Sequence, residues 1–156
     1  MLAESALPDS ADIRLLTEIG FLAAGRGDLA RAEAIFGALA LLRPRQASAH
    51  VGLAMALLNK GRFADAAATL ERVTLPTGPE RDLLGAVRGL ALQLDRRTAE
   101  ASRVLRAIAS QPVATPPGPS DGMRLARRLL GDEAPPPSAE DSAAVPMPGQ
   151  VPAFRP

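Results

Sequence analysis

The stretch AGRGDLARAEAIFGALALLRP, residues 24–44, decides the fold because a similar line, NKGRFADAAATLERV, follows it at residues 59–73. When the two lines are aligned, Gly27 falls on Gly61 and Phe36 falls on Leu70, each 34 residues later. Self-similarity at a period of this size is typical of architectures in which helical hairpins stack side by side. The repeat also explains Arg26-Gly27-Asp28, which looks like a cell-adhesion signal but is predicted to be the turn between two helices.

The repeated positions resemble the tetratricopeptide repeat (TPR), whose pattern is W-x2-L-G-x2-Y, then A-x3-F, then P. The first copy reads Leu16-x2-Ile19-Gly20-x2-Ala23, Ala32-x3-Phe36 and Pro44, and the second reads His50-x2-Leu53-Ala54-x2-Leu57 and Ala66-x3-Leu70. The small residues allow the two helices of a hairpin to approach closely. A glycine at the end of each first helix suits the left-handed backbone that such an end requires.

A weaker third copy follows at residues 81–112. ERDLLGAVRGLALQLD suits a first helix and TAEASRVLRAIAS a second, with Ala101 and Leu105 lying 35 residues after Ala66 and Leu70. We infer one extra residue in the turn LDRRT, residues 94–98. The prediction is an all-α, TPR-like solenoid of about three helical hairpins, with repeats near 13–46, 47–80 and 81–112.

Eleven of the 15 prolines lie between Pro112 and Pro156, which marks a boundary near Ser110. We expect a flexible N-terminus over residues 1–11, a TPR-like domain over 12–110, and a Pro-rich, largely disordered tail over 111–156. Within this tail, Ser120 or Asp121 followed by GMRLARRLLGD predicts a short helix over residues 121–131.

Composition narrows the chemistry. The net charge is +1, which is no electrostatic footprint for nucleic acid, and there is no cysteine and one histidine, His50. No nucleophile has a base to activate it, and no carboxylates pair, so we expect neither an enzyme nor a metal or other cofactor site. The N-terminus has no basic residue before Arg14, and no apolar run approaches the roughly 18 residues of a membrane span, so a cytoplasmic protein is expected.

The expected function is carried by the concave surface that the first helices of stacked hairpins line. TPR geometry places a protein-binding groove there, formed by Arg14, Thr17, Phe21, Val51, Met55, Leu58, Asn59 and Leu90. Leu83, Ala86 and Gln93 are the other candidates from the third repeat. This groove is mainly apolar, so it suits an amphipathic helix or an extended segment with apolar anchors. The Lys/Asn/Arg clamp of TPR proteins that hold heat-shock chaperones is replaced here by Thr17, Phe21, Val51 and Met55.

Residues 32–71, AEAIFGALALLRPRQASAHVGLAMALLNKGRFADAAATLE, resemble the small TPR chaperones of bacterial type III secretion. That resemblance implies a cytoplasmic chaperone that holds an aggregation-prone needle or translocator subunit in its groove before export. The alternative is a TPR scaffold that joins a larger assembly or forms a homodimer, with the Met123–Leu130 segment docking in the groove of a neighbour.

Overall fold

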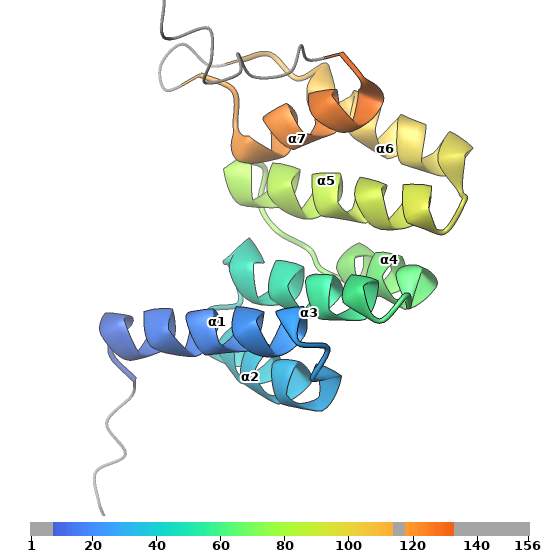
Figure 1. Cartoon of the computed structure of the whole chain (residues 1–156). Coiled ribbons are helices and arrows are strands. Elements are labelled where there is room, and N and C mark those ends of the chain that lie inside the picture. Colours follow the sequence, from blue (N-terminus) through green and yellow to red (C-terminus); the bar gives the residue numbers. More distant parts are fainter. Residues whose placement is uncertain (1–7, 114–117, 133–156) are drawn as a thin grey trace, which may run out of the picture.

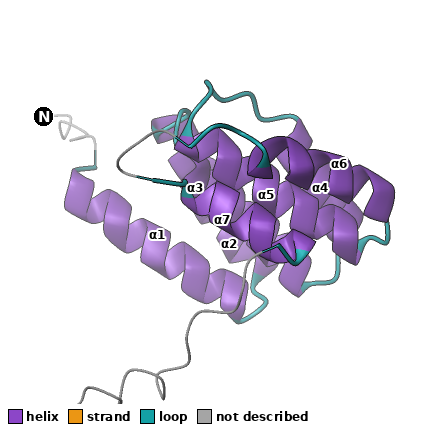
Figure 2. Cartoon of the chain, turned by 90° about the horizontal axis from the view of Figure 1, so that it is seen from above, coloured by secondary structure: helices purple, strands orange, loops and turns teal. Residues whose placement is uncertain are grey.

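The computed structural model describes residues 8–113 and 118–132, and within these ranges every regular element is a helix (Figures 1 and 2). Residues 1–7 of the predicted flexible N-terminus (residues 1–11) lie outside the described residues, as do residues 114–117 and 133–156 of the predicted tail (residues 111–156). A helix already begins at Ser10, inside the predicted flexible segment. The helices are α1 (Ser10–Gly25), α2 (Leu29–Leu42), α3 (Ala47–Asn59), α4 (Phe63–Glu71), α5 (Pro79–Leu94), α6 (Thr98–Ala109) and α7 (Asp121–Leu130).

Consecutive helices pair into three hairpins, α1–α2, α3–α4 and α5–α6, and each hairpin packs on the next. The first helices of the hairpins and α7 contact one another in the order α1, α3, α5, α7, from the bottom to the top of Figure 1. This arrangement confirms the predicted all-α, TPR-like solenoid. We call α1, α3, α5 and α7 the A helices.

The A-x3-F element forms the centre of each hairpin. The large side chain that ends this element is at most 1% exposed in every copy, at Phe36, Leu70 and Leu105. Opposite them lie the small residues of the A helices: a Cβ added at Gly20 would lie 2.8 Å from Phe36 Cζ, and one at Gly89 would overlap the Leu105 side chain. The small residues are therefore required for the two helices of a hairpin to touch.

The turn inside each hairpin has the same geometry in all three copies. Its central residue has a left-handed backbone, with φ of 74° at Gly27, 72° at Gly61 and 63° at Arg96. The residue after it donates its backbone N–H across the turn at 2.9 Å, in the pairs Asp28–Ala23, Arg62–Leu57 and Arg97–Leu92. The predicted left-handed glycines are confirmed, and the third turn uses an arginine in their place.

The register of the third repeat corrects one inference from the sequence. Arg96 lies 35 residues after Gly61, and Leu92, which accepts the hydrogen bond across the turn, lies 35 residues after Leu57. The offset of 35 is therefore already present before the turn begins. The extra residue precedes Leu92 and does not lie in the turn at residues 94–98.

Helix α7 continues the repeat for half a hairpin. Its last turn closes with Gly131 at a φ of 81° and with the Asp132 N–H donating to Arg127 O at 3.0 Å, again 35 residues after the equivalent bond in α5. The helix packs against α5 and α6 and buries Met123 and Ala126 there. A helix was predicted here as part of the tail, and the alternative hypothesis had it dock in the groove of a neighbouring copy; the structure docks it on its own chain.

A buried carboxylate fixes the start of α7. Asp82 is 6% exposed and accepts hydrogen bonds from Gln111 Nε2 at 3.1 Å and from Ser120 Oγ at 2.9 Å. The Ser120 hydroxyl also caps α7 by accepting from the Met123 N–H at 3.1 Å. Gly122 then lies directly against the backbone of Asp82, so α7 crosses the first turn of α5 without a side chain between them.

Candidate protein-binding surface

One position of the repeat is apolar in all four A helices. Phe21, Met55, Leu90 and Leu125 follow one another at spacings of 34, 35 and 35 residues. Because neighbouring A helices are in contact, the repeat places these side chains at equivalent positions on successive helices of the stack, and we call them the apolar row. Phe21 is 40% exposed, and the other three are partly exposed. Each side chain of the apolar row is therefore partly packed against the protein and partly accessible to solvent.

Two kinds of packing hold the apolar row in place. The Phe21 ring meets the buried Phe36 ring edge-on, with centroids 5.1 Å apart and planes at 67°, which is a favourable aromatic arrangement. Met55, Leu90 and Leu125 all pack against one buried cluster shared by the second and third hairpins. The row is thus an exposed edge of the core, and its members are positioned before any partner arrives.

Three polar residues of the predicted groove are also accounted for. Arg14 Nε donates to Glu18 Oε1 at 3.1 Å on the exposed surface of α1. Thr17 Oγ1 donates to Ile13 O at 2.7 Å within the same helix. Asn59 Nδ2 donates to Ala24 O at 3.1 Å, so it connects the ends of α3 and α1. Arg14 and Asn59 are exposed beside the apolar row, and Thr17 is half-buried.

The remaining candidates divide between surface and core. Val51 is half-buried beside Met55, as expected for the wall of a groove. Leu58 is only 9% exposed and belongs to the main buried cluster, so it contributes little to the accessible surface beside Met55. Ala86 is fully buried. Leu125 was missed, although its 35-residue spacing from Leu90 is readable in GMRLARRLL once that segment is treated as a repeat.

The described residues offer no metal-binding group beside the apolar row. Within the described ranges there is no cluster of three or more His, Asp or Glu side chains able to hold a metal ion. His50 is partly buried at the start of α3, and the loss of solvent lowers its pKa below the usual 6.5. None of the helices in the described part of the chain is long and apolar enough to cross a membrane.

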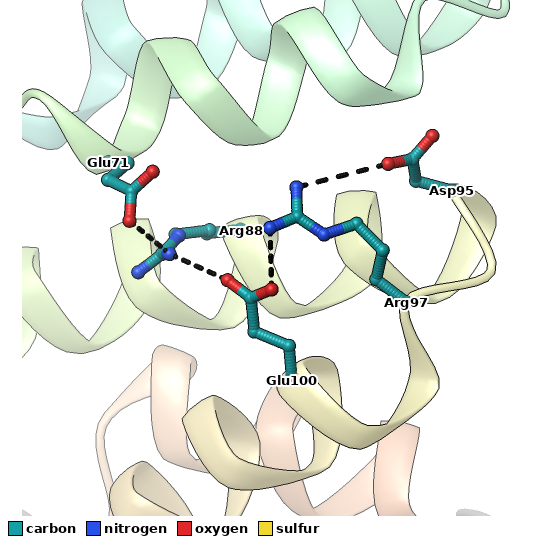
Figure 3. A network of polar contacts seen from close by, with 5 residues as sticks. All are labelled: Glu71, Arg88, Asp95, Arg97 and Glu100. Carbon is teal, nitrogen blue, oxygen red and sulfur yellow. Dashed lines mark hydrogen bonds and ion pairs between the residues drawn. The ribbon is translucent and has the colours of Figure 1, made fainter.

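A separate pocket of about 600 Å³ lies between α4, the α4–α5 connection, α5 and α6, and no residue of the predicted groove lines it. At its edge, Arg88 Nη2 donates to Glu71 Oε1 at 2.6 Å and to Glu100 Oε1 at 3.2 Å (Figure 3). Arg97 reaches the other oxygen of Glu100 at 2.5 Å. These contacts join three helices from two hairpins, so the simplest role of the network is to fix the second hairpin against the third.

Comparison with known proteins supports the same repeat. Residues 23–88 match the tetratricopeptide repeat family, from the last three residues of α1 to the middle of α5. This match supports a TPR protein and, with it, a role in protein–protein interaction. No match was found among curated proteins or among solved structures.

Proposed function

From the TPR match over residues 23–88, we propose that this chain is a non-enzymatic binding protein whose apolar row holds a segment of another polypeptide. The observation that carries the proposal is the row itself: four A helices present a large apolar side chain at one repeat position, and Phe21 is 40% exposed. A methionine in the row suits a surface that adapts to more than one side-chain shape.

The spacing of the row sets the pattern of anchors that a partner needs. Packed helices lie about 8–10 Å apart, so neighbouring members of the row are separated by roughly that distance. A partner helix that crosses the A helices would match it with apolar residues about seven positions apart, since seven residues rise about 10.5 Å. An extended segment would match it with every third residue, at about 3.3 Å per residue. We expect one of these two patterns in the partner.

More specifically, we propose a cytoplasmic chaperone that keeps an aggregation-prone needle or translocator subunit soluble. Type III secretion is the system in which to test this proposal first. The resemblance of residues 32–71 to that chaperone class supports it, together with an uncharged row that could cover an apolar segment. An acidic C-terminal peptide is a poorer alternative, because Thr17, Phe21, Val51 and Met55 stand where the TPR proteins that hold such peptides have their Lys/Asn/Arg clamp.

The test is co-production of the chain with such a subunit, followed by measurement of the subunit in the soluble fraction. Phe21→Glu plus Met55→Glu places two charges in the row and should return the subunit to the pellet. Leu41→Glu is the matched control, because Leu41 is 85% exposed and lies on α2, which contributes no residue to the apolar row. Equal solubility with the double variant, shown to be folded by circular dichroism, would reject the groove.

A self-associating scaffold is the second candidate, but its surface differs from the one expected. The Met123–Leu130 segment was the assembly element of that hypothesis, and α7 buries Met123 against its own α5 and α6. With Met123 already buried within its own chain, an apolar surface on α1 is a better candidate for self-association.

A further inference from the structure

Helix α1 exposes an apolar stripe that is distinct from the apolar row. Of the eight large apolar side chains that are exposed in the described residues, four lie on α1. Phe21 belongs to the apolar row, and the other three form what we call the outer row: Leu15 is 57% exposed, Ile19 38% and Leu22 60%. Spacings of four and three residues put these three on one side of the helix.

The repeat shows what the outer row is built to do. Its equivalents in α3 are Ala49, Leu53 and Ala56, and all three pack into the cluster formed by α1 and α2. The equivalents in α7 include Met123 and Ala126, which are buried against α5 and α6. Each later A helix therefore uses this side to contact the preceding hairpin. In α1 the same side has no described element on it.

At the other end of the stack, the exposed side of α7 is charged. The side of α7 that would receive a following hairpin carries Asp121, Arg124 and Arg128, all exposed. Arg124 stands at the position that is Gly20, Ala54 and Gly89 in the three hairpins. An apolar first end cannot be matched by this charged last end, so head-to-tail stacking of copies is disfavoured.

We propose that the outer row is a dimer interface, in which α1 of one chain packs against α1 of a second copy around a twofold axis. A twofold contact is self-complementary, so it pairs one apolar end with another and closes after two copies. Leucines at 15 and 22, where the internal interface uses alanines at 49 and 56, also fit a pair of facing helices better than another close-packed hairpin. Ile19 between two leucines is a combination that favours two-stranded helix pairing.

The contact is limited in size. Stable interfaces bury about 800 Å² on each partner, which is more than three side chains supply, so we expect a dimer that dissociates on dilution. This proposal does not rest on the proposed function, because Phe21 is displaced from each residue of the outer row by roughly 100° or more around α1.

The first test is the mass of the full chain in solution, measured by sedimentation equilibrium over a series of concentrations. The mass should rise with concentration to twice the 16.2 kDa of one chain. Leu15→Glu plus Leu22→Glu removes four leucines from each dimer. If the loss of each leucine raises the dissociation constant about tenfold, the double variant should raise it by about 10⁴-fold. Leu15→Gln plus Leu22→Gln, which adds no charge, should also abolish the dimer.

The matched control is Leu94→Glu, because Leu94 is 44% exposed on α5, which does not contact α1. This variant should dimerise like the wild type. A wild-type mass of one chain at every concentration, or an unchanged dimer in the outer-row variants, would overturn the proposal. Dimerisation that survives in the outer-row variants but is lost in Leu94→Glu would place the interface elsewhere and overturn it equally.

The second test locates the contact without disrupting it. Ile19 is midway along the outer row, so a twofold axis brings it close to its own copy whether the two helices run parallel or antiparallel. The chain has no cysteine, and Ile19→Cys would introduce one thiol. Mild oxidation should convert this variant to a disulfide-linked dimer, because disulfides require Cα atoms within about 7 Å. Ala30→Cys on α2 should run as a monomer on a non-reducing gel after the same oxidation. Equal cross-linking of the Ala30→Cys and Ile19→Cys variants would contradict a contact through the outer row.

Discussion

Replacing Gly122 with alanine tests whether α7 is an integral part of the domain. A Cβ added there would lie closer than 3.0 Å to backbone atoms of Asp82 and Leu83, and these atoms cannot rotate away as a side chain can. The substitution must either shift the start of α7 or separate it from α5. Elsewhere in a helix, Gly→Ala is favourable by about 0.5–1 kcal/mol, because alanine loses less backbone freedom.

The expected sign is therefore reversed. Overpacking a tight contact costs about 1–3 kcal/mol, so Gly122→Ala should lower the free energy of unfolding by that amount. The loss of stability cannot exceed the free energy of docking α7, because the chain can release α7 from α5 instead of keeping the clash. Release would expose Met123, which is 4% exposed, and burial of such a side chain contributes about 1.5–3 kcal/mol.

Urea unfolding of the variant measures the free energy, and trypsin measures the release of α7. Arg124, Arg127 and Arg128 lie within the helix, and cleavage there should be faster in the variant. Gly37→Ala is the matched control, because Gly37 lies inside α2 and an added Cβ meets nothing within 4 Å. It should stabilise the protein by about 0.5–1 kcal/mol. If Gly122→Ala were as stabilising as this control and equally resistant to trypsin, the docking of α7 on α5 would be refuted.

Three further predictions concern single residues. Arg96→Gly should stabilise the protein by about 1 kcal/mol in urea unfolding, because it removes a non-glycine residue from a φ of 63°. Glu80→Gln should lower stability by about 0.5–1 kcal/mol, because Glu80 Oε2 accepts the Ala47 N–H at 2.5 Å and places a charge at the start of α3. Burial lowers the pKa of His50 below 6.5, so the unfolded chain binds a proton there more readily than the folded chain. The stability that neutral His50 contributes above pH 6.5 should therefore be lost as the pH falls through 6.5 and then through the lower pKa of the folded state. His50→Gln should remove this part of the pH dependence of the thermal midpoint.

The sequence predicts the hairpins well because their packing is local and recurs. Each pair of a small A-helix residue with a large residue of the next helix, such as Gly20 with Phe36, is set by two positions at a fixed separation. The left-handed turn residues follow from glycine at 27 and 61. Phe21 and Met55 could likewise be placed at the accessible edge, since their register follows from the same repeat.

Features that depend on contacts between hairpins were less predictable. Leu58 was expected at the surface, but the next hairpin covers it, and the amount of cover depends on where α5 begins. The Glu80 carboxylate accepts the N–H of Ala47, 33 residues earlier, and no pattern in the sequence indicates this contact. Such a contact requires the relative position of two hairpins, which the 35-residue spacing of the third repeat obscured.

The two ends of the solenoid show why α7 could have been found from the sequence. A repeat continues where its A helix keeps a small residue for the following helix to contact, as at Ala54 and Gly89, and it stops where that residue is large and charged, as at Arg124. The same segment keeps the alanine that faces the preceding hairpin, Ala126, in register with Ala91 and Ala56. A helix with one side in register with the repeat and one charged side is typical of the end of a solenoid. By the same criterion α1 has no charged outer side, because Leu15 and Leu22 stand where a terminal helix would need polar residues, and this is the physical reason to expect a second chain there.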